Sequence, residues 1–303
     1  MDDRHLTQDG VVHSTFGGLP PEFSNYERAR FVLVPLPYDL TSSYRPGARN
    51  GPEAILSASR YLELYDEELE SEPYRAGIHT LPFFEPVATG PEAQSARVEQ
   101  IIGSLLEAGK FPILLGGDHS LTIGAIAAIA QKHPHFTALQ FDAHADLRDE
   151  YEGTRFSHAC VGRRIAERAK LVQMGIRSLS LEEAEYLKKA SVTVGYAAEL
   201  ERDPLLIGRL LRELRDPIYL TIDVDVFDPS IMPATGTPEP GGLDWYTVLS
   251  ILRSVCEAHQ VVGADVVELA PLPGQVAPDF LAAKLIYKLV GYLSSRHKEA
   301  GSE

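Results

Sequence analysis

The stretch FTALQFDAHAD, residues 136–146, joins a mostly apolar run to a cluster of charged side chains. An apolar run without strict alternation is typical of a strand that is buried on both faces of a parallel sheet. Comparable runs occur at residues 31–36, 111–115, 171–176, 218–222 and 261–267. We therefore predict a mostly parallel sheet, with the charged residues of the 136–146 stretch placed just beyond the end of one strand.

Apolar residues between these predicted strands recur with the period of a helix. Pro52 follows Gly51 and is well placed to begin one helix. Two further helical faces are formed by Val98, Ile101, Ile102, Leu105 and Leu106, and by Leu206, Leu210, Leu211 and Leu214. Strands that alternate with helices indicate βαβ units with right-handed crossovers. We predict a single-domain, three-layer α/β/α fold over residues 30–303, preceded by a polar N-terminal arm over residues 1–29.

The composition excludes several classes of protein. The chain has 303 residues, with 28 Lys and Arg against 43 Asp and Glu, so its formal net charge is −15. This charge argues against nucleic acid as the main partner and suits a small cation or metal ions. No apolar run approaches the roughly 20 residues of a membrane span, and the N-terminus has no apolar signal region. The two cysteines, Cys160 and Cys256, agree with a reducing compartment. Together with the missing apolar segments, they lead us to expect a cytoplasmic protein without a membrane partner.

Chemically active side chains follow three of the predicted strands. His119 lies in the segment 116–120, Asp142, His144 and Asp146 alternate after the second strand, and residues 223–225 hold two aspartates. In open α/β sheets, ligands bind beyond the carboxyl ends of the strands, so these segments should meet in one crevice. Alternate residues of an extended backbone point to one side, which aims each set of side chains at the same point.

Such a group of carboxylates and imidazoles predicts a metal centre. Unpaired like charges at this density would raise one another's pKa values and destabilise the fold. Six ligands exceed what one catalytic ion takes from protein, so two bridged ions are the simpler arrangement. Oxygen-rich ligation with imidazole and no thiolate favours Mn²⁺, with Fe²⁺ or Co²⁺ as alternatives. The predicted ligands are His119, Asp142, His144, Asp146, Asp223 and Asp225.

At this point the sequence resembles the arginase–agmatinase (ureohydrolase) family, and most of all its agmatinases and aminopropylagmatine ureohydrolases. The likeness extends from about residue 38 to residue 289, through the segments 44–52, 116–120, 142–146, 155–158, 223–229, 235–242 and 265–268. It implies an arginase/deacetylase-type parallel sheet of about eight strands. It also implies two Mn²⁺ per chain, hydrolysis of a small cationic guanidine to urea, and a homo-oligomer, either a trimer or a hexamer.

The resemblance also implies roles for individual residues. One ion would be held by His119, Asp142, Asp146 and Asp223, and the other by Asp142, His144, Asp223 and Asp225, with Asp142 and Asp223 bridging. Asp146 would hold a proton of the attacking hydroxide and pass it to the leaving amine. Glu268 resembles the carboxylate that pairs with the substrate guanidinium. His158 matches the proton-shuttle histidine, a role that suits imidazole near neutral pH.

Substrate choice is expected to depend on residues 147–157, which follow the predicted ligands. In arginases the corresponding loop supplies Asn, Ser and Thr groups that hold a carboxylate and an α-amine, whereas here it carries Asp149, Glu150 and Glu152. An acidic loop repels a carboxylate and attracts an amine. We therefore predict Glu150 and Glu152 as substrate-binding residues. Agmatine is the predicted substrate, giving putrescine and urea, and N1-aminopropylagmatine, giving spermidine and urea, is the alternative.

Three other functions compete with this interpretation. An arginase or guanidino-acid hydrolase is disfavoured by the acidic loop. A deacetylase-like zinc amidohydrolase would need one ion, whereas the second aspartate of 223–225 and the full set in 142–146 favour two. A catalytically inactive polyamine-binding homologue is disfavoured by the intact ligands together with Glu268 and His158. Metal content and urea release separate these alternatives.

Overall fold

Eight parallel strands form the central sheet of this computed structural model, which describes residues 15–299. The strand order is β2-β1-β3-β8-β7-β4-β5-β6. The strands are β1 (Phe31–Leu36), β2 (Ile78–Thr80), β3 (Phe111–Gly116), β4 (Thr137–Phe141), β5 (Lys170–Ile176), β6 (Val192–Tyr196), β7 (Ile218–Asp223) and β8 (Val261–Val267). The order places β3, β8, β7 and β4 side by side in the middle, so their carboxyl ends meet at one edge.

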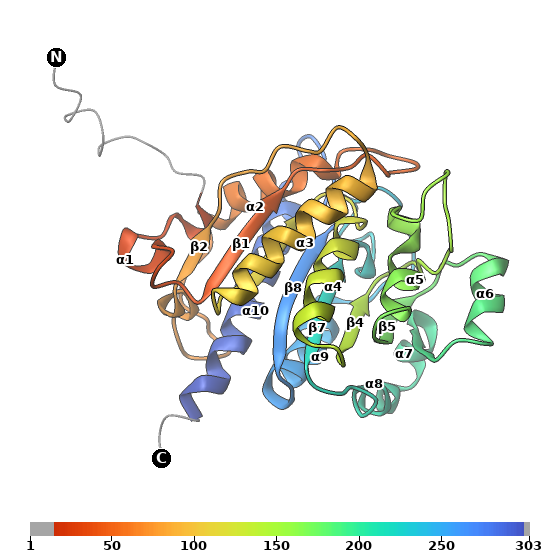
Figure 1. Cartoon of the computed structure of the whole chain (residues 1–303). Coiled ribbons are helices and arrows are strands. Elements are labelled where there is room, and N and C mark those ends of the chain that lie inside the picture. The colour runs from red at the N-terminus through yellow and green to blue at the C-terminus, as the bar shows by residue number, and fades with distance from the viewer. Residues whose placement is uncertain (1–14, 300–303) are drawn as a thin grey trace.

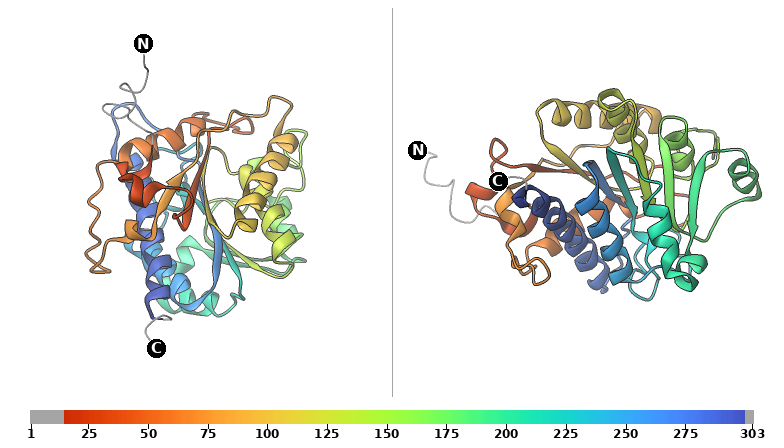
Figure 2. Two further views of the ribbon diagram at one scale, coloured as in Figure 1. Left: turned by 60° about the vertical axis from the view of Figure 1, so that its left-hand side comes forward. Right: turned by 90° about the horizontal axis from the view of Figure 1, so that it is seen from below.

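Helices cover both faces of the sheet, as Figures 1 and 2 show. One face carries α3 and α4, and the other carries α2, α9 and α10. The helices are α1 (Pro21–Ser24), α2 (Gly51–Ser59), α3 (Pro91–Glu107), α4 (Leu121–Lys132), α5 (Val161–Ala166), α6 (Leu181–Leu187), α7 (Ala197–Arg202), α8 (Pro204–Leu211), α9 (Trp245–Ala258) and α10 (Ala277–Glu299).

Strand β1 shows why the strand sequences are apolar throughout. Phe31 and Leu33 belong to the hydrophobic cluster that includes α2, α9 and α10. Val32 and Val34 belong to the cluster that includes α3 and α4. Because successive side chains point to opposite faces and both faces are covered, every position of this strand is buried. The three-layer α/β/α prediction is confirmed.

All the strands predicted from sequence are present, and their bounds differ by no more than one residue at either end. Helix α2 begins at Gly51 with Pro52 in its first turn, also as predicted. The sequence analysis missed the two edge strands, β2 and β6. β2 has only 3 residues, and most residues of β6 are only partly buried, so neither produces a long apolar run.

The N-terminal side of the domain is packed on its own chain. Residues 1–14 of the predicted arm lie outside the described residues. Within the rest of that segment, Phe16 is buried against Tyr287 of α10, and its backbone N–H donates to the hydroxyl of Thr80 at 3.1 Å. Among the described residues, none of the helices has the length and apolar character needed to cross a membrane.

Candidate metal centre and active site

The four central strands each deliver a functional side chain to the same edge of the sheet. His119 follows β3, residues 142–146 follow β4, residues 223–225 include the end of β7, and Glu268 follows β8. All of these groups except Asp142 line one cavity of about 270 Å³, and Asp142 lies directly behind His119. The structure therefore brings together the segments that the sequence predicted to converge.

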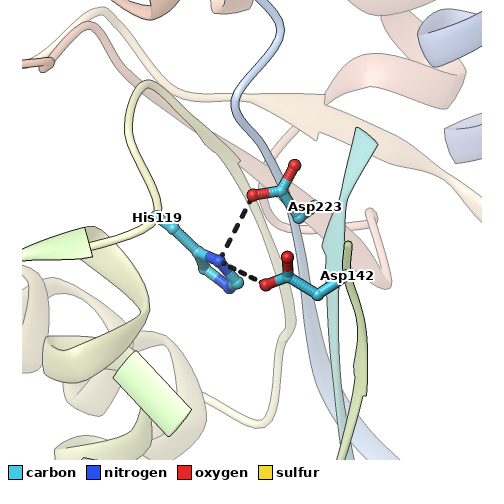
Figure 3. A group of neighbouring side chains, drawn as sticks. All are labelled: His119, Asp142 and Asp223. Atoms are coloured by element: carbon cyan, nitrogen blue, oxygen red, sulfur yellow. Dashed lines mark ion pairs between the residues drawn. The ribbon is translucent and has the colours of Figure 1, made fainter. Parts of the chain in front are cut away.

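The imidazole of His119 faces three carboxylates. Its Nδ1 atom lies 3.1 Å from Oδ2 of Asp142, 3.3 Å from Oδ2 of Asp146 and 3.4 Å from Oδ2 of Asp223. Figure 3 shows His119 directed at Asp142 and Asp223, which come from neighbouring strands. Close packing of three carboxylate oxygens around one nitrogen is the donor arrangement of a divalent cation site.

A second imidazole completes an adjoining group. Nδ1 of His144 lies 2.9 Å from Oδ2 of Asp225 and 3.6 Å from Oδ1 of Asp142. Asp142 therefore belongs to both groups and offers a different oxygen to each. A carboxylate shared in this way is the feature expected of two bridged ions.

Local backbone geometry holds these carboxylates in place. Oδ1 of Asp142 accepts the N–H of His144 at 2.6 Å, and Oδ1 of Asp223 accepts the N–H of Asp225 at 2.9 Å. The amide of Gln140 donates to Oδ2 of Asp142 at 2.7 Å. Short turns after each strand thus give each aspartate a backbone donor, and Asp142 keeps Oδ2 directed at His119 and Oδ1 directed at His144.

Gly117 explains the glycine pair that precedes His119. A Cβ atom at this position would lie 1.6 Å from the carbonyl oxygen of Tyr38. The close approach of the two backbones places residues 38–45 beside the cavity, where Ser42, Ser43, Tyr44 and Arg45 form part of the wall. Only glycine permits this contact.

Two site residues have left-handed backbone conformations that non-glycine residues rarely adopt. The φ angle is 52° at Asp146 and 66° at Glu268. Glu268 is further held by the N–H of His119, which donates to its Oε1 at 2.7 Å. Strain of this kind costs about 1–3 kcal/mol and occurs most often at functional sites.

Burial and excess negative charge raise the pKa values of several groups in the cluster. Burial and the charge of Asp142 raise the pKa of Asp146 to about 7. Burial and the charge of Asp118 raise the pKa of Glu268 well above its usual range. Burial would lower the pKa of His119, but its three close aspartate neighbours raise it well above the ordinary value.

One atom tests directly whether these residues suit a metal ion. Nδ1 of His119 is buried and has no hydrogen-bond partner among the described residues. Carboxylate oxygens nevertheless surround it at 3.1–3.4 Å. This nitrogen and these oxygens repel one another unless a proton or a metal ion lies between them, so the donor set fits a divalent ion.

His158 begins a short 3-10 helix, residues His158–Cys160, at the wall of the same cavity. Its backbone N–H donates to the hydroxyl of Thr41 at 3.1 Å, and its Nε2 lies 3.4 Å from the hydroxyl of Ser43. Burial, together with positive charge on the two cluster histidines, lowers the pKa of His158 to about 4. The imidazole is therefore neutral near neutral pH.

The 147–157 loop differs from the sequence-based picture of an acidic wall. The cavity is lined by Arg148 and Tyr151, and Glu150 and Glu152 are not among its described lining residues. Both glutamates are exposed, although Glu152 is near enough to raise the pKa of His158 slightly against the larger opposing effects. That Glu150 and Glu152 contribute to substrate binding stays a prediction, and it would depend on their electrostatic effect at the mouth of the cavity.

Ion pairing within the loop further reduces its negative charge. Asp149 lies 2.9 Å from Nη2 of Arg155 and 2.6 Å from Nη2 of Arg164. The guanidinium of Arg148 stacks on Tyr151, with 5.0 Å between its carbon and the ring centroid. Arg148 and Tyr151 were not predicted as wall residues, because the charge pattern of the loop carries no information about its turn geometry.

The sequence analysis also missed Thr41. Its backbone N–H and its hydroxyl each donate to Oδ2 of Asp118 at 2.9 Å, while the hydroxyl accepts the N–H of His158. Thr41 thus connects the segment after β3 to the one that carries His158. Position 41 alone gave no signal, but an aspartate beside His119 in a glycine-rich turn indicated a carboxylate in need of donors.

Comparisons with known proteins agree with this geometry. The arginase family profile matches residues 29–291. The chain belongs to the arginase family. Proteins of this family depend on a binuclear metal centre, and the ureohydrolases among them act on guanidino compounds. The membership confirms the resemblance inferred from sequence, and the chain is an enzyme of this hydrolase class.

Individual relatives place the chain within the family. It is 41% identical to an N(1)-aminopropylagmatine ureohydrolase of Synechocystis over 89% of this chain and 90% of that protein. It is 35% identical to an agmatinase of Pyrococcus horikoshii over 87% and 92%. The solved agmatine ureohydrolase of Thermoplasma volcanium has a TM-score of 0.88 at 31% identity and covers 97% of this chain and 99% of its own.

Proposed function

We propose that the chain hydrolyses the guanidinium group of N1-aminopropylagmatine to spermidine and urea, with agmatine as the second candidate substrate. The observation that supports this proposal most is the meeting of two His/Asp groups, joined through Asp142, with the buried Glu268 in one cavity. The order of candidates reverses our sequence-based preference. It follows the 41% identity to an aminopropylagmatine ureohydrolase against 35–37% to agmatinases.

Two Mn²⁺ ions are the proposed cofactors. His119, Asp142, Asp146 and Asp223 would hold one ion, and Asp142, His144, Asp223 and Asp225 would hold the other. When bound, the ions supply a hydroxide nucleophile near neutral pH, which the resonance-stabilised guanidinium group requires. The cluster carries 4 aspartates and no Lys or Arg within it, so two divalent ions neutralise its charge.

Glu268 is proposed to bind the substrate guanidinium. Its carboxylate is buried at the cavity wall, and within residues 15–299 Oε1 alone accepts a backbone hydrogen bond, from His119. The remaining lone pairs can accept N–H groups of a planar cation in a bidentate contact. Because burial and the charge of Asp118 raise the pKa of Glu268, an arriving cation also favours its ionised form.

Asp146 and His158 are proposed to move protons. The Asp146 carboxylate lines the cavity beside the other metal-ligand candidates, so it is placed to take a proton from the attacking group and deliver it to the leaving nitrogen. The neutral imidazole of His158 stands at the cavity wall beside Ser43. From there it can pass a proton between the leaving amine and solvent.

A competition experiment tests the substrate proposal. Purified protein loaded with Mn²⁺ is given equal concentrations of N1-aminopropylagmatine and agmatine, and spermidine and putrescine are quantified at early times. The product ratio equals the ratio of the two kcat/KM values, and we expect spermidine to exceed putrescine. An excess of putrescine would favour agmatine, and release of neither amine would refute both candidates.

A further inference from the structure

Behind the metal-ligand candidates lies a buried polar group that the proposed chemistry does not use. Asp265 is fully buried on β8 in the middle of the sheet. Its Oδ1 accepts the hydroxyl of Thr221 at 2.7 Å. Its Oδ2 accepts the hydroxyls of Tyr219 at 2.8 Å and Thr122 at 3.0 Å. A buried carboxylate is costly, and a purely structural position would be filled more favourably by an apolar side chain.

The strand register places this carboxylate within reach of the metal centre. Thr221 and Asp265 are paired neighbours on β7 and β8, two residues before the ends that carry Asp223 and Val267. These two strands run side by side in Figure 1, with α4 in front of them. The hydroxyl oxygen of Thr221 also lies 2.8 Å from Nε2 of His119.

Hydrogen-bond logic assigns the direction of each contact. An ionised carboxylate only accepts hydrogen bonds, so the single hydroxyl proton of Thr221 is donated to Asp265. Toward His119 the same oxygen can then act only as an acceptor. Nε2 of His119 must therefore carry a proton, and Nδ1 is the nitrogen left to face the aspartates at 3.1–3.4 Å.

We propose that Thr221 and Asp265 form a positioning relay that fixes the tautomer and ring orientation of His119, so that Nδ1 is presented to one metal ion. The relay rests on the metal centre of the proposed function, although it does not depend on which substrate is cleaved. Groups that orient a ligating histidine through its other nitrogen typically change metal affinity 10- to 100-fold when removed. Thr221 and Asp265 are positioning residues, since neither faces the cavity.

The test is the affinity of the protein for Mn²⁺, measured by chelator competition together with the stoichiometry of binding. Thr221→Val removes the hydroxyl at nearly constant volume, and we expect one of the two ions to bind about 10- to 100-fold more weakly. Thr221→Ser keeps the hydroxyl and should retain the parental affinity. Tyr219→Phe is the matched control, because it removes another donor to Asp265 but leaves the contact between Thr221 and His119 intact.

A spectroscopic measurement separates positioning from general destabilisation. At two equivalents of Mn²⁺, the parental protein should show the magnetic resonance signal of a coupled ion pair. Thr221→Val should show mainly the six-line signal of uncoupled Mn²⁺, and its metal-free form should unfold at the parental temperature. If Thr221→Val does not fold, Thr221→Ala carries the same expectation.

Two results would overturn the relay. One is parental affinity for both ions in the valine or alanine variant, and the other is equal weakening by Tyr219→Phe. Because the measurement uses Mn²⁺ without any substrate, it tests the relay independently of whether the protein hydrolyses a guanidinium group. An enzyme without urea release that still loses one ion in Thr221→Val would refute the proposed function and retain the relay.

Discussion

The strand-end segments and the 147–157 loop border the same cavity, yet they hold their acidic groups in opposite ways. Asp142 and Asp223 are buried and fixed by backbone N–H groups within their own turns. In the loop, Asp149 is paired with arginines, and Glu150 is exposed. Carboxylates that lie together at a sheet edge with no lysine or arginine among them indicate a cation site. Carboxylates on an exposed loop need not act on the cavity that the loop borders.

The largest expected effect tests the strand-end side of this comparison. Asp223→Asn removes a charge near His119, and we expect metal content to fall and kcat to drop by about 10³-fold or more, since metal stabilisation contributes several kcal/mol. Elemental analysis and urea release measure the two effects. Asp149→Asn, in the loop, is the matched control and should change kcat by no more than about twofold. Similar losses of metal and of kcat in both variants would contradict the proposed difference between the strand-end segments and the loop.

A smaller loss is expected at His158, which lies where the two regions meet. His158→Asn removes the proton carrier but keeps a polar side chain, so kcat should fall about 10²-fold while KM changes little. Steady-state urea release measures both constants. His135→Asn provides the control. His135 is exposed just before the amino end of β4, whereas the metal-ligand candidates follow the carboxyl end of that strand. An unchanged kcat in His158→Asn would remove this residue from proton transfer.

The pH dependence of metal binding should also distinguish the regions. Burial and the charge of Asp142 raise the pKa of Asp146 to about 7 in the metal-free protein. Against the effect of burial, the neighbouring aspartates raise the pKa values of His119 and His144, so both imidazoles also release protons when an ion binds. Below about pH 7 the additional proton on Asp146 should steepen the fall in Mn²⁺ affinity by about tenfold per pH unit. Calorimetry between about pH 5.5 and 8 measures the slope. A slope that does not steepen below about pH 7 would contradict the assignment of Asp146 as a ligand.

The smallest effect is expected from the exposed glutamates. Replacing Glu150 and Glu152 together by Gln should raise KM for an amine-terminated substrate by about two- to threefold and leave kcat nearly unchanged, because solvent screens exposed charges. Tyr151→Ala, within the same loop but at the cavity wall, tests whether contact matters more than charge. A tenfold rise in KM for the glutamine variant would show that the loop acts as the sequence analysis proposed.

The sequence was sufficient to predict the sheet, the fold class and the segments that meet at its edge. The reason is physical: strands buried on both faces must be apolar throughout, and side chains two residues apart after such strands share one direction. The edge strand β6 lacked that burial, and the edge strand β2 has only 3 residues, so neither left a comparable pattern.

The wall of the cavity could not be predicted in the same way. Arg148 lies there because it stacks on Tyr151, and Thr41 reaches His158 because Gly117 allows two backbones to touch. The contact between Thr41 and His158 joins residues 117 positions apart, and the contact between Arg148 and Tyr151 depends on the turn geometry of an irregular loop. No local period or spacing reports either contact. The relay behind His119 depends likewise on the register of β7 and β8, which a single sequence does not display.

The central claim is that a binuclear cluster at the sheet edge cleaves guanidines that end in an amine. The most direct measurement is kcat/KM for urea release by the Mn²⁺-loaded protein with N1-aminopropylagmatine, agmatine, arginine and 4-guanidinobutyrate, repeated after chelation. We predict that both amine-terminated substrates exceed both carboxylate-terminated ones by at least about tenfold, which corresponds to about 1.4 kcal/mol, and that chelation abolishes all activity. Equal rates with arginine, or urea release that survives metal removal, would contradict the account.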